Sequence, residues 1–427
     1  MSPLSDNVDG NHTCASKWCC HSNAKVIFVQ HPIHRTIICK DRFIKTHKKE
    51  FDDKTDLWFL CHQEGEQMKT LTLFYVGLFL TIFSGSAHAS CPSKVKLPIH
   101  LKTYGHCQHQ AIIYLHGGPG DHTQVFTHTT AKAIAQKGFF VVTYDRRGTG
   151  RSSRQTKPTD FTFKRAIEDL HQIITQLKLK SGVILLGHSF GGVLGLKYLE
   201  SHPDTHAKLV LVSAPLDYPK LFKQLLDRFL KMYPAFIQRA TQQKRHNMAS
   251  AMKRAMGTCQ MLRTFMFPKK GPLSPLWYST RQIGFIFSLA MQFGLYTPKN
   301  ISQAAKARYA KLSKKGHIRM AYKPFAGFIR NEQYAMKDYT PLAQTLKQHI
   351  YGVYGQQDGL FNKTRLAHIQ RVLGKQRMTI LQRAGHAPFV DRQQAFLQAL
   401  KRISSNPTSK PTSQPSSQPS SQPSSNP

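Results

Sequence analysis

Short apolar runs alternate with longer, partly polar stretches through the middle of the chain. The runs are rich in Val, Ile, Leu and aromatic residues, and they lie at residues 111–115, 139–144, 182–186, 209–213, 350–354 and 378–381. Continuous apolar runs of this length are typical of strands that are buried on both faces of a sheet. Because helix-like stretches lie between them, the pattern predicts an α/β protein.

Residues 217–340 interrupt this alternation. Apolar side chains recur there at helical spacing, in a first group (Leu221, Phe222, Leu225, Leu226, Phe229, Leu230 and Tyr233) and in a second (Phe285, Leu289 and Phe293). The spacing predicts a helical cap inserted into a core that comprises residues 90–216 and 341–403. Two interpretations of the apolar side chains stay open: they pack the cap onto the sheet, or some of them line an apolar pocket.

The start of the chain follows another pattern. A basic start at Met68, a 13-residue apolar run from Leu71 to Phe83 and a terminal Ala87-His88-Ala89 have the layout of a secretory signal peptide over residues 68–89. A signal anchor in a membrane is the alternative, although the run is shorter than the roughly 20 residues that span a bilayer. We therefore expect a periplasmic or secreted product, and we expect residues 1–67 to be a non-native upstream extension or disordered.

The last residues, 404–427, are almost entirely Ser, Pro, Gln, Thr and Asn. A segment without apolar residues cannot offset its ordering entropy, so we expect a disordered tail. A chain cut after Arg402 is accordingly expected to stay active.

Three cysteines follow the predicted signal peptide. Cys91 and Cys107 flank a predicted first hairpin and are candidates for a disulfide in an oxidising compartment, which leaves Cys259 free. The spacing of the cysteines near the start, Cys14, Cys19 and Cys20, matches no standard zinc site.

The formal net charge is +38. Such a charge favours electrostatic association with anionic surfaces. No zinc-finger spacing or RNA-binding signature accompanies it, so no specific nucleic-acid partner is expected. The charge says nothing about the oligomeric state.

A serine lies at a strand-to-helix junction. The run at 182–186 leads into Gly187-His188-Ser189-Phe190-Gly191, and a helix-like stretch follows. This is the pattern of a nucleophile elbow, whose glycines let strand and helix approach so closely that a Cβ would clash. The turn exposes Ser189 and brings the backbone N–H of Phe190 beside it, where it can bind an oxyanion.

A glycine-rich loop precedes the elbow. The run at 111–115 leads into His116-Gly117-Gly118-Pro119-Gly120, and the N–H of Gly118 is the second candidate donor of an oxyanion hole. The alternative is that these glycines serve only the turn. Asp145, which ends the run at 139–144, is expected to fix a turn, because it precedes the serine in the chain.

Two further candidates follow later strands. Asp358 comes just after the run at 350–354, and His386 follows the run at 378–381. The order Ser, Asp, His is that of a triad in which His386 moves the proton of the Ser189 hydroxyl and Asp358 orients the imidazole. Asp391 is the alternative acid, although it follows His386.

Together these segments resemble the α/β-hydrolase superfamily, and within it the proline iminopeptidase group of serine hydrolases, over residues 95 to 402. The resemblance implies an α/β-hydrolase fold: a mostly parallel central sheet with helices on both faces and an inserted helical cap. It implies catalysis by Ser189, His386 and Asp358 on a small-molecule or peptide substrate, with neither a metal nor an organic cofactor.

The chain departs from that group in its cap. Proline iminopeptidases hold the substrate amine with cap glutamates and often have Trp after the nucleophile, where this chain has Phe190. Residues 217–340 contain 23 Lys or Arg against four acids, of which only Glu332 is a candidate anchor. We therefore expect a secreted serine hydrolase that cleaves an ester or amide bond through an acyl-enzyme, aminopeptidase-like, with a carboxylesterase or lipase-type enzyme as the alternative. A non-catalytic binding protein on the same fold is the third possibility.

Overall fold

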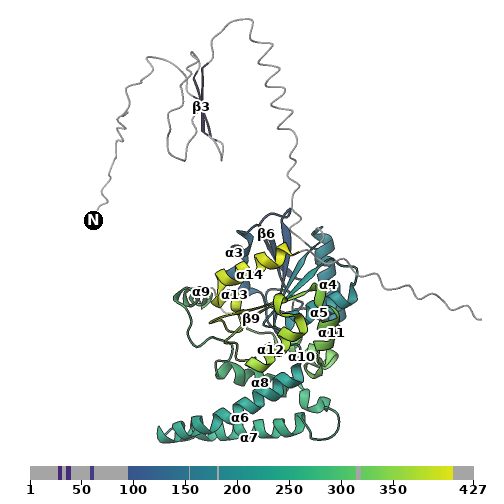
Figure 1. Cartoon of the computed structure of the whole chain (residues 1–427), viewed down its shortest axis with the longest axis vertical. Coiled ribbons are helices and arrows are strands. Elements are labelled where there is room, and N and C mark those ends of the chain that lie inside the picture. The colour runs from purple at the N-terminus through teal and green to yellow at the C-terminus, as the bar shows by residue number, and fades with distance from the viewer. Residues whose placement is uncertain are drawn as a thin grey trace, which may run out of the picture. The chain divides into compact units, whose positions relative to one another are not determined.

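The computed structural model describes residues 27–30, 35–39, 58–61, 95–152, 154–179, 182–313 and 319–406 (Figure 1). The chain divides into two compact units, residues 1–89 and 90–427. The predicted signal peptide, Cys91 and the tail from residue 407 lie outside the described residues.

The first unit contains a three-stranded sheet in the order β1-β2-β3, with strands Ile27–Gln30, Arg35–Cys39 and Trp58–Cys61. β1 and β2 are antiparallel, and β2 and β3 are parallel. The sequence pattern predicts no helix or strand in this region. The strands are rich in β-branched and aromatic residues, which favour extended backbone even in runs too short to show a periodic pattern.

The second unit is built on a seven-stranded sheet in the order β10-β9-β8-β7-β5-β6-β4. All its pairs are parallel except β4 with β6. Its strands are β4 His100–Tyr104, β5 Gln110–Leu115, β6 Phe139–Asp145, β7 Ile184–His188, β8 Lys208–Val212, β9 Ile350–Gly355 and β10 Met378–Leu381. The six predicted strands are confirmed. The predicted first hairpin between Cys91 and Cys107 is not found in the described residues 95–107, where β4 is the one strand and pairs with β6.

Helices cover both faces of this sheet, and two clusters of buried side chains fill the space between. One cluster joins Ile113, Leu185 and Leu209 to helices α4, α5 and α12, and the other joins Ile112, Leu186 and Val210 to α3, α13 and α14. Neighbouring strand residues therefore point to opposite cores, as in strands buried on both faces. The helices are α2 Gln124–Phe126, α3 Lys132–Ala135, α4 Phe163–Gln176, α5 Phe190–Ser201, α11 Thr340–Thr345, α12 Lys363–Leu373, α13 Pro388–Asp391 and α14 Gln393–Ser405, with a π-helical turn at Thr127–Ala131.

The predicted helical cap follows β8 and ends before β9. Its helices are α6 Tyr218–Gln242, α7 His246–Met266, α8 Thr280–Gln292, α9 Gln303–Ser313 and α10 Tyr322–Glu332. Figure 1 shows α6 and α7 packed side by side beyond α8. The chain leaves and re-enters the core at one place, where Asp217 and Asp338 form a bridge and the Tyr339 N–H donates to the Leu216 carbonyl over 2.7 Å.

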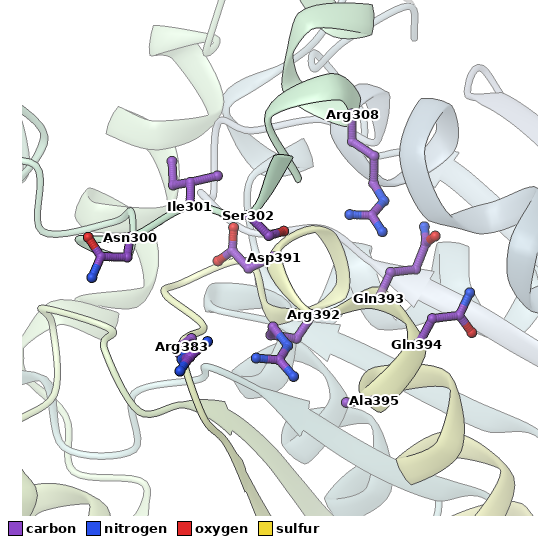
Figure 2. Close-up of a pocket in the computed structure, with 10 residues that line it drawn as sticks. All are labelled: Asn300, Ile301, Ser302, Arg308, Arg383, Asp391, Arg392, Gln393, Gln394 and Ala395. Atoms are coloured by element: carbon purple, nitrogen blue, oxygen red, sulfur yellow. The ribbon is translucent and has the colours of Figure 1, made fainter. Parts of the chain in front are cut away.

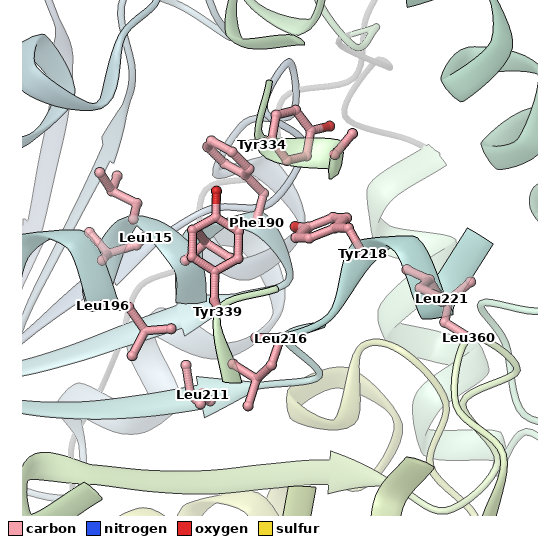
Figure 3. Packing of buried hydrophobic residues seen from close by; sticks show 14 of the residues in the cluster. Leu115, Phe190, Leu196, Leu211, Leu216, Tyr218, Leu221, Tyr334, Tyr339 and Leu360 are labelled. Atoms are coloured by element: carbon pink, nitrogen blue, oxygen red, sulfur yellow. The ribbon is translucent and has the colours of Figure 1, made fainter. Parts of the chain in front are cut away.

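The apolar stripe of α6 is core. Six of its side chains are buried in the same cluster as residues of the main sheet and of helix α5: Leu221, Phe222, Leu225, Leu226, Phe229 and Tyr233. In Figure 3, Phe190, Tyr218, Tyr334 and Tyr339 gather between the start of α5, the start of α6 and the segment that leads to α11. The cap is thus joined to the elbow helix by aromatic packing.

Helix α14 ends at Ser405, so ordered structure extends beyond the predicted tail boundary at residue 404. Ile403 is buried, and the buried Lys208 Nζ donates to the carbonyls of Ile403 and Ser404 over 3.1 and 3.0 Å and to that of Asn406. A cut after Arg402 would remove these partners, so we expect it to lower the stability of the fold, while the activity of such a chain stays a prediction.

Cys107 is disulfide-bonded, and Cys259 is free and buried in α7. Cys91, the predicted partner of Cys107, is outside the described residues. Within the described part of the chain, no helix combines the length and the apolar character needed to cross a bilayer.

Candidate active site

Ser189 occupies the sharp turn between β7 and α5. Its backbone has φ +52° and ψ −120°, a conformation that non-glycine residues seldom adopt. A Cβ on Gly191 would lie 2.0 Å from the Leu115 carbonyl oxygen, and one on Gly187 would lie 2.6 Å from the Gly192 Cα. The glycines therefore permit the close approach of strand and helix that the sequence motif predicts.

His386 and Asp358 are in contact, although they lie on loops that follow two different strands, β10 and β9. The His386 Nδ1 lies 2.8 Å from the Asp358 Oδ2, and the two residues are 5% and 1% exposed. The other carboxylate oxygen accepts the Leu360 N–H over 3.0 Å. A buried carboxylate in this position fixes the imidazole ring and leaves Nε2 free to accept a proton.

The structure brings the Ser189 and His386 loops together through the residue before the serine. The His188 Nε2 lies 2.9 Å from the His386 carbonyl oxygen, so it acts as donor, and burial together with the neighbouring His386 lowers the pKa of His188 to about 3. Within the described residues, no hydrogen bond joins the Ser189 hydroxyl to His386 or Asp358.

A segment of the cap lies against His386. The His386 N–H donates to the Tyr296 carbonyl over 2.8 Å, and the two rings meet edge to face at 5.0 Å. The Gly359 N–H, beside Asp358, donates to the Leu295 carbonyl over 2.7 Å. The link between α8 and α9 thus holds both loops at once.

Asp391, the alternative acid, supports the His386 loop from the other side. Its Oδ2 accepts the Gly385 N–H over 2.8 Å, and its Oδ1 accepts the Tyr309 hydroxyl over 3.1 Å. Burial raises its pKa. Its carboxylate contacts the backbone beside His386, whereas that of Asp358 contacts the imidazole.

The loop after β5 is held by an arginine. The Arg146 guanidinium donates to the carbonyls of His116, Gly117 and Pro119 over 2.7, 2.6 and 3.0 Å, and it lies 5.3 Å from the centre of the Phe190 ring. Burial lowers its pKa to about 10. Because Arg146 holds three of its carbonyls, the loop after β5 is fixed beside the turn that contains Ser189.

The two candidate oxyanion donors have free N–H groups. Neither the Gly118 N–H nor the Phe190 N–H donates a hydrogen bond to another described residue. Unpaired N–H groups beside a nucleophile elbow are what an oxyanion hole requires.

Glu332, the candidate amine anchor, has another partner. Its Oε1 accepts the Phe163 N–H over 2.7 Å, at the first turn of α4. The carboxylate thus binds a helix N-terminus, where negative charge is favourable, and joins the cap to the core. Its role as an anchor for a substrate amine stays a prediction.

Asp145 fixes a turn, as the sequence predicts. Its Oδ1 accepts both the N–H and the hydroxyl of Thr123 over 2.8 Å, and its Oδ2 accepts the Arg151 N–H over 2.9 Å. This prediction is confirmed.

Sequence reasoning missed Arg146, His188 and Tyr296. Arg146 and His188 lie inside motifs that were recognised, but their partners come from other strands and nothing in the local pattern identifies them. Tyr296 lies in the cap, 90 residues before His386, and carries no motif.

Comparison with known proteins agrees with this geometry. The sequence model of the α/β-hydrolase fold family matches residues 110–393. The proline iminopeptidase of Lactobacillus delbrueckii subsp. lactis is 34% identical over 126 residues, which cover 29% of this chain and 42% of that protein. That of Heyndrickxia coagulans is 36% identical over 127 residues, covering 30% and 42%. The chain thus spans less than half the length of these relatives.

A solved structure extends the likeness over more of the chain. A proline iminopeptidase-related protein of Thermus thermophilus superposes with a TM-score of 0.50 at 23% identity, over 71% of this chain and 92% of the other. At this identity the superposition concerns the fold alone. The family match, the sheet order and the elbow lead to one conclusion: the chain belongs to the α/β-hydrolase family, and it resembles the proline iminopeptidases.

Proposed function

We propose that the protein is a serine hydrolase that cleaves an ester or amide bond through an acyl-enzyme. The observation that carries this proposal is the buried 2.8 Å contact between His386 and Asp358, beside the elbow that holds Ser189. Ser189 attacks the carbonyl carbon, and His386 takes the hydroxyl proton and returns it to the leaving group. Water then attacks the acyl-enzyme, and the same histidine again moves the proton.

Asp358 and the two free N–H groups complete the mechanism. Asp358 holds the imidazole tautomer and stabilises the imidazolium ion, while the N–H groups of Gly118 and Phe190 bind the oxyanion of the tetrahedral intermediate. The hydrogen bond between Ser189 and His386 that this chemistry needs is of the kind that often tightens only once substrate is bound.

The relatives favour an amide substrate with a free N-terminus. Proline iminopeptidase is the name of both bacterial relatives described above, each of which matches part of this chain. The engagement of Glu332 with Phe163 favours the alternative, an ester of an apolar acid, because the candidate amine anchor already binds the backbone of the core.

A substrate panel with two variants tests both the proposed nucleophile and the proposed substrate class. Purified protein is assayed on prolyl-aminoacyl amides and on p-nitrophenyl acyl esters. Ser189→Ala is expected to abolish turnover of whichever class is hydrolysed. Undiminished turnover by this variant would overturn the proposal.

Glu332→Gln separates the two substrate classes. A glutamine oxygen still accepts the Phe163 N–H, so the fold is retained while the charge is lost. An unchanged KM for prolyl amides supports the structural role of Glu332. A KM raised about tenfold or more, with ester KM unchanged, supports an ammonium anchor.

We also propose that the protein is exported, with residues 68–89 as its signal peptide. The disulfide of Cys107 supports an oxidising compartment. N-terminal sequencing of the secreted product is expected to begin at Ser90. A product that is retained in the cell with its first 89 residues intact would contradict this.

A further inference from the structure

A polar cavity lies behind the His386 loop. Its volume is about 560 Å³, and it is bounded by the start of the α9 segment, the end of β10 and the start of α14. Figure 2 shows its walls, which are formed by Asn300, Ile301, Ser302, Arg308, Arg383, Asp391, Arg392, Gln393, Gln394 and Ala395. None of these is a candidate catalytic residue apart from the alternative acid Asp391.

The charge of this cavity is strongly unbalanced. It contains three arginines and a single carboxylate, and both oxygens of Asp391 already accept hydrogen bonds from Gly385 and Tyr309. Arg308 uses one N–H on the Val390 carbonyl, at 2.9 Å. The side chains of Arg383 and Arg392 form no hydrogen bond or ion pair with any described residue. Most of the guanidinium donors are therefore available to a ligand.

The backbone adds donors of the same kind. Gln393, Gln394 and Ala395 are the first three residues of α14, whose N-cap residue Arg392 makes no side-chain cap. Their N–H groups donate to no described residue, and no acidic side chain lies in this first turn. Unpaired N–H groups at a helix N-terminus favour an anion, and the three arginines concentrate positive charge on the same space.

We propose that this cavity is a binding site for a small, multiply charged oxyanion that carries phosphate or carboxylate groups. Guanidinium groups bind both through paired N–H donors. The ligand would connect three segments: α9 through Arg308, the end of β10 through Arg383, and the α13–α14 junction through Arg392.

The site is connected to the loop of His386. Arg383 precedes His386 by three residues, and Asp391 holds the Gly385 N–H. A bound anion would therefore restrain both ends of this loop. The binding proposal itself does not depend on the hydrolase activity.

Isothermal titration of the full chain tests the site at constant ionic strength. The probes are inorganic phosphate, inorganic diphosphate and citrate. We expect saturable binding of one equivalent, with Kd raised about tenfold in Arg383→Gln and in Arg392→Gln. Tight binding of diphosphate supports a phosphate-bearing ligand, and tight binding of citrate supports a carboxylate-bearing one.

Two further variants distinguish binding in this cavity from binding that depends only on the net charge of the chain. Arg330→Gln removes an equal charge from an exposed position on α10 that is outside the cavity, and it is expected to leave Kd unchanged. Gln394→Glu adds a carboxylate to the first turn of α14, which favours the helix but repels the ligand. We expect it to raise Kd while the melting temperature is kept or raised.

The outcomes that overturn the proposal are distinct from these. One is the absence of saturable binding of all three probes. The other is an equal loss of affinity in Arg330→Gln and Arg392→Gln, since the net charge of the chain would then account for the binding. Neither result bears on Ser189, because titration does not measure turnover.

Discussion

At the scale of single residues, the proposed mechanism depends on the contact between His386 and Asp358. Asp358→Asn keeps an oxygen for the Leu360 N–H but presents an amide to the imidazole, which favours the wrong tautomer. We expect kcat to fall by about 10³-fold or more with the fold retained. Steady-state kinetics and circular dichroism measure the two effects.

Asp391→Asn is the matched control, because Asp391 is equally buried and was the alternative acid. Its substitution is expected to lower stability more than kcat, since its partners are the Gly385 N–H and the Tyr309 hydroxyl. A larger loss of kcat in Asp391→Asn than in Asp358→Asn would reassign the acid.

His188 gives the protein a pH-dependent stability. Its pKa is lowered by burial from the ordinary 6.5 to about 3, so the unfolded chain binds the proton more readily than the folded one. This contribution to stability is complete above pH 6.5 and is lost as the pH falls toward 3. Burial lowers the pKa of His116 in the same direction.

Urea unfolding at pH 7 and pH 5 measures this effect. The pH decrease is expected to cost the wild type about 1–2 kcal/mol through His188. His188→Asn keeps a donor for the His386 carbonyl without the titration, so its loss between the two pH values is expected to be smaller by that amount. Equal losses in both proteins would contradict the assignment.

At the scale of elements, the loop after β5 depends on Arg146. Arg146→Lys removes the planar set of donors that holds three carbonyls, so the Gly118 N–H loses its fixed direction. We expect kcat to fall by about 10²-fold with little change in KM, because the oxyanion exists only after attack.

Arg147→Lys is the control for Arg146. Arg147 donates two hydrogen bonds of 2.8 Å to Asp169, away from the loop carbonyls. Its substitution is expected to lower the melting temperature and leave kcat unchanged. Equal kcat losses in the two variants would remove the positioning role of Arg146.

The elements themselves show what sequence can predict. Strands buried on both faces produce short but uninterrupted apolar runs, so the sequence alone predicts β5 to β10. The sequence does not predict the partner of β4, because this pairing depends on contacts between segments about 40 residues apart.

The same difference applies to the candidate site. Ser189, Asp358 and His386 can be predicted from their places after strands, whereas Arg146 and His188 contact partners that only folding brings near.

At the scale of the whole molecule, Lys208 holds the C-terminal end of the second unit by binding its backbone carbonyls. A chain ending at Asn406 keeps the carbonyls that Lys208 binds, and we expect its free energy of unfolding to stay within about 0.5 kcal/mol of the full chain. A chain ending at Arg402 loses these partners and buried Ile403, which is expected to cost about 2–4 kcal/mol. Urea unfolding of both chains checks this, and equal stability of the two would contradict it.

Ser189 as the nucleophile is the claim on which the account depends, and mapping a fluorophosphonate adduct tests it most directly. The full chain is treated with the probe, digested and analysed by mass spectrometry. We predict one adduct, on the peptide that contains Ser189, absent in Ser189→Ala and formed far more slowly in His386→Ala. An adduct on another serine that forms equally fast in Ser189→Ala, or no adduct on the folded protein, would contradict it.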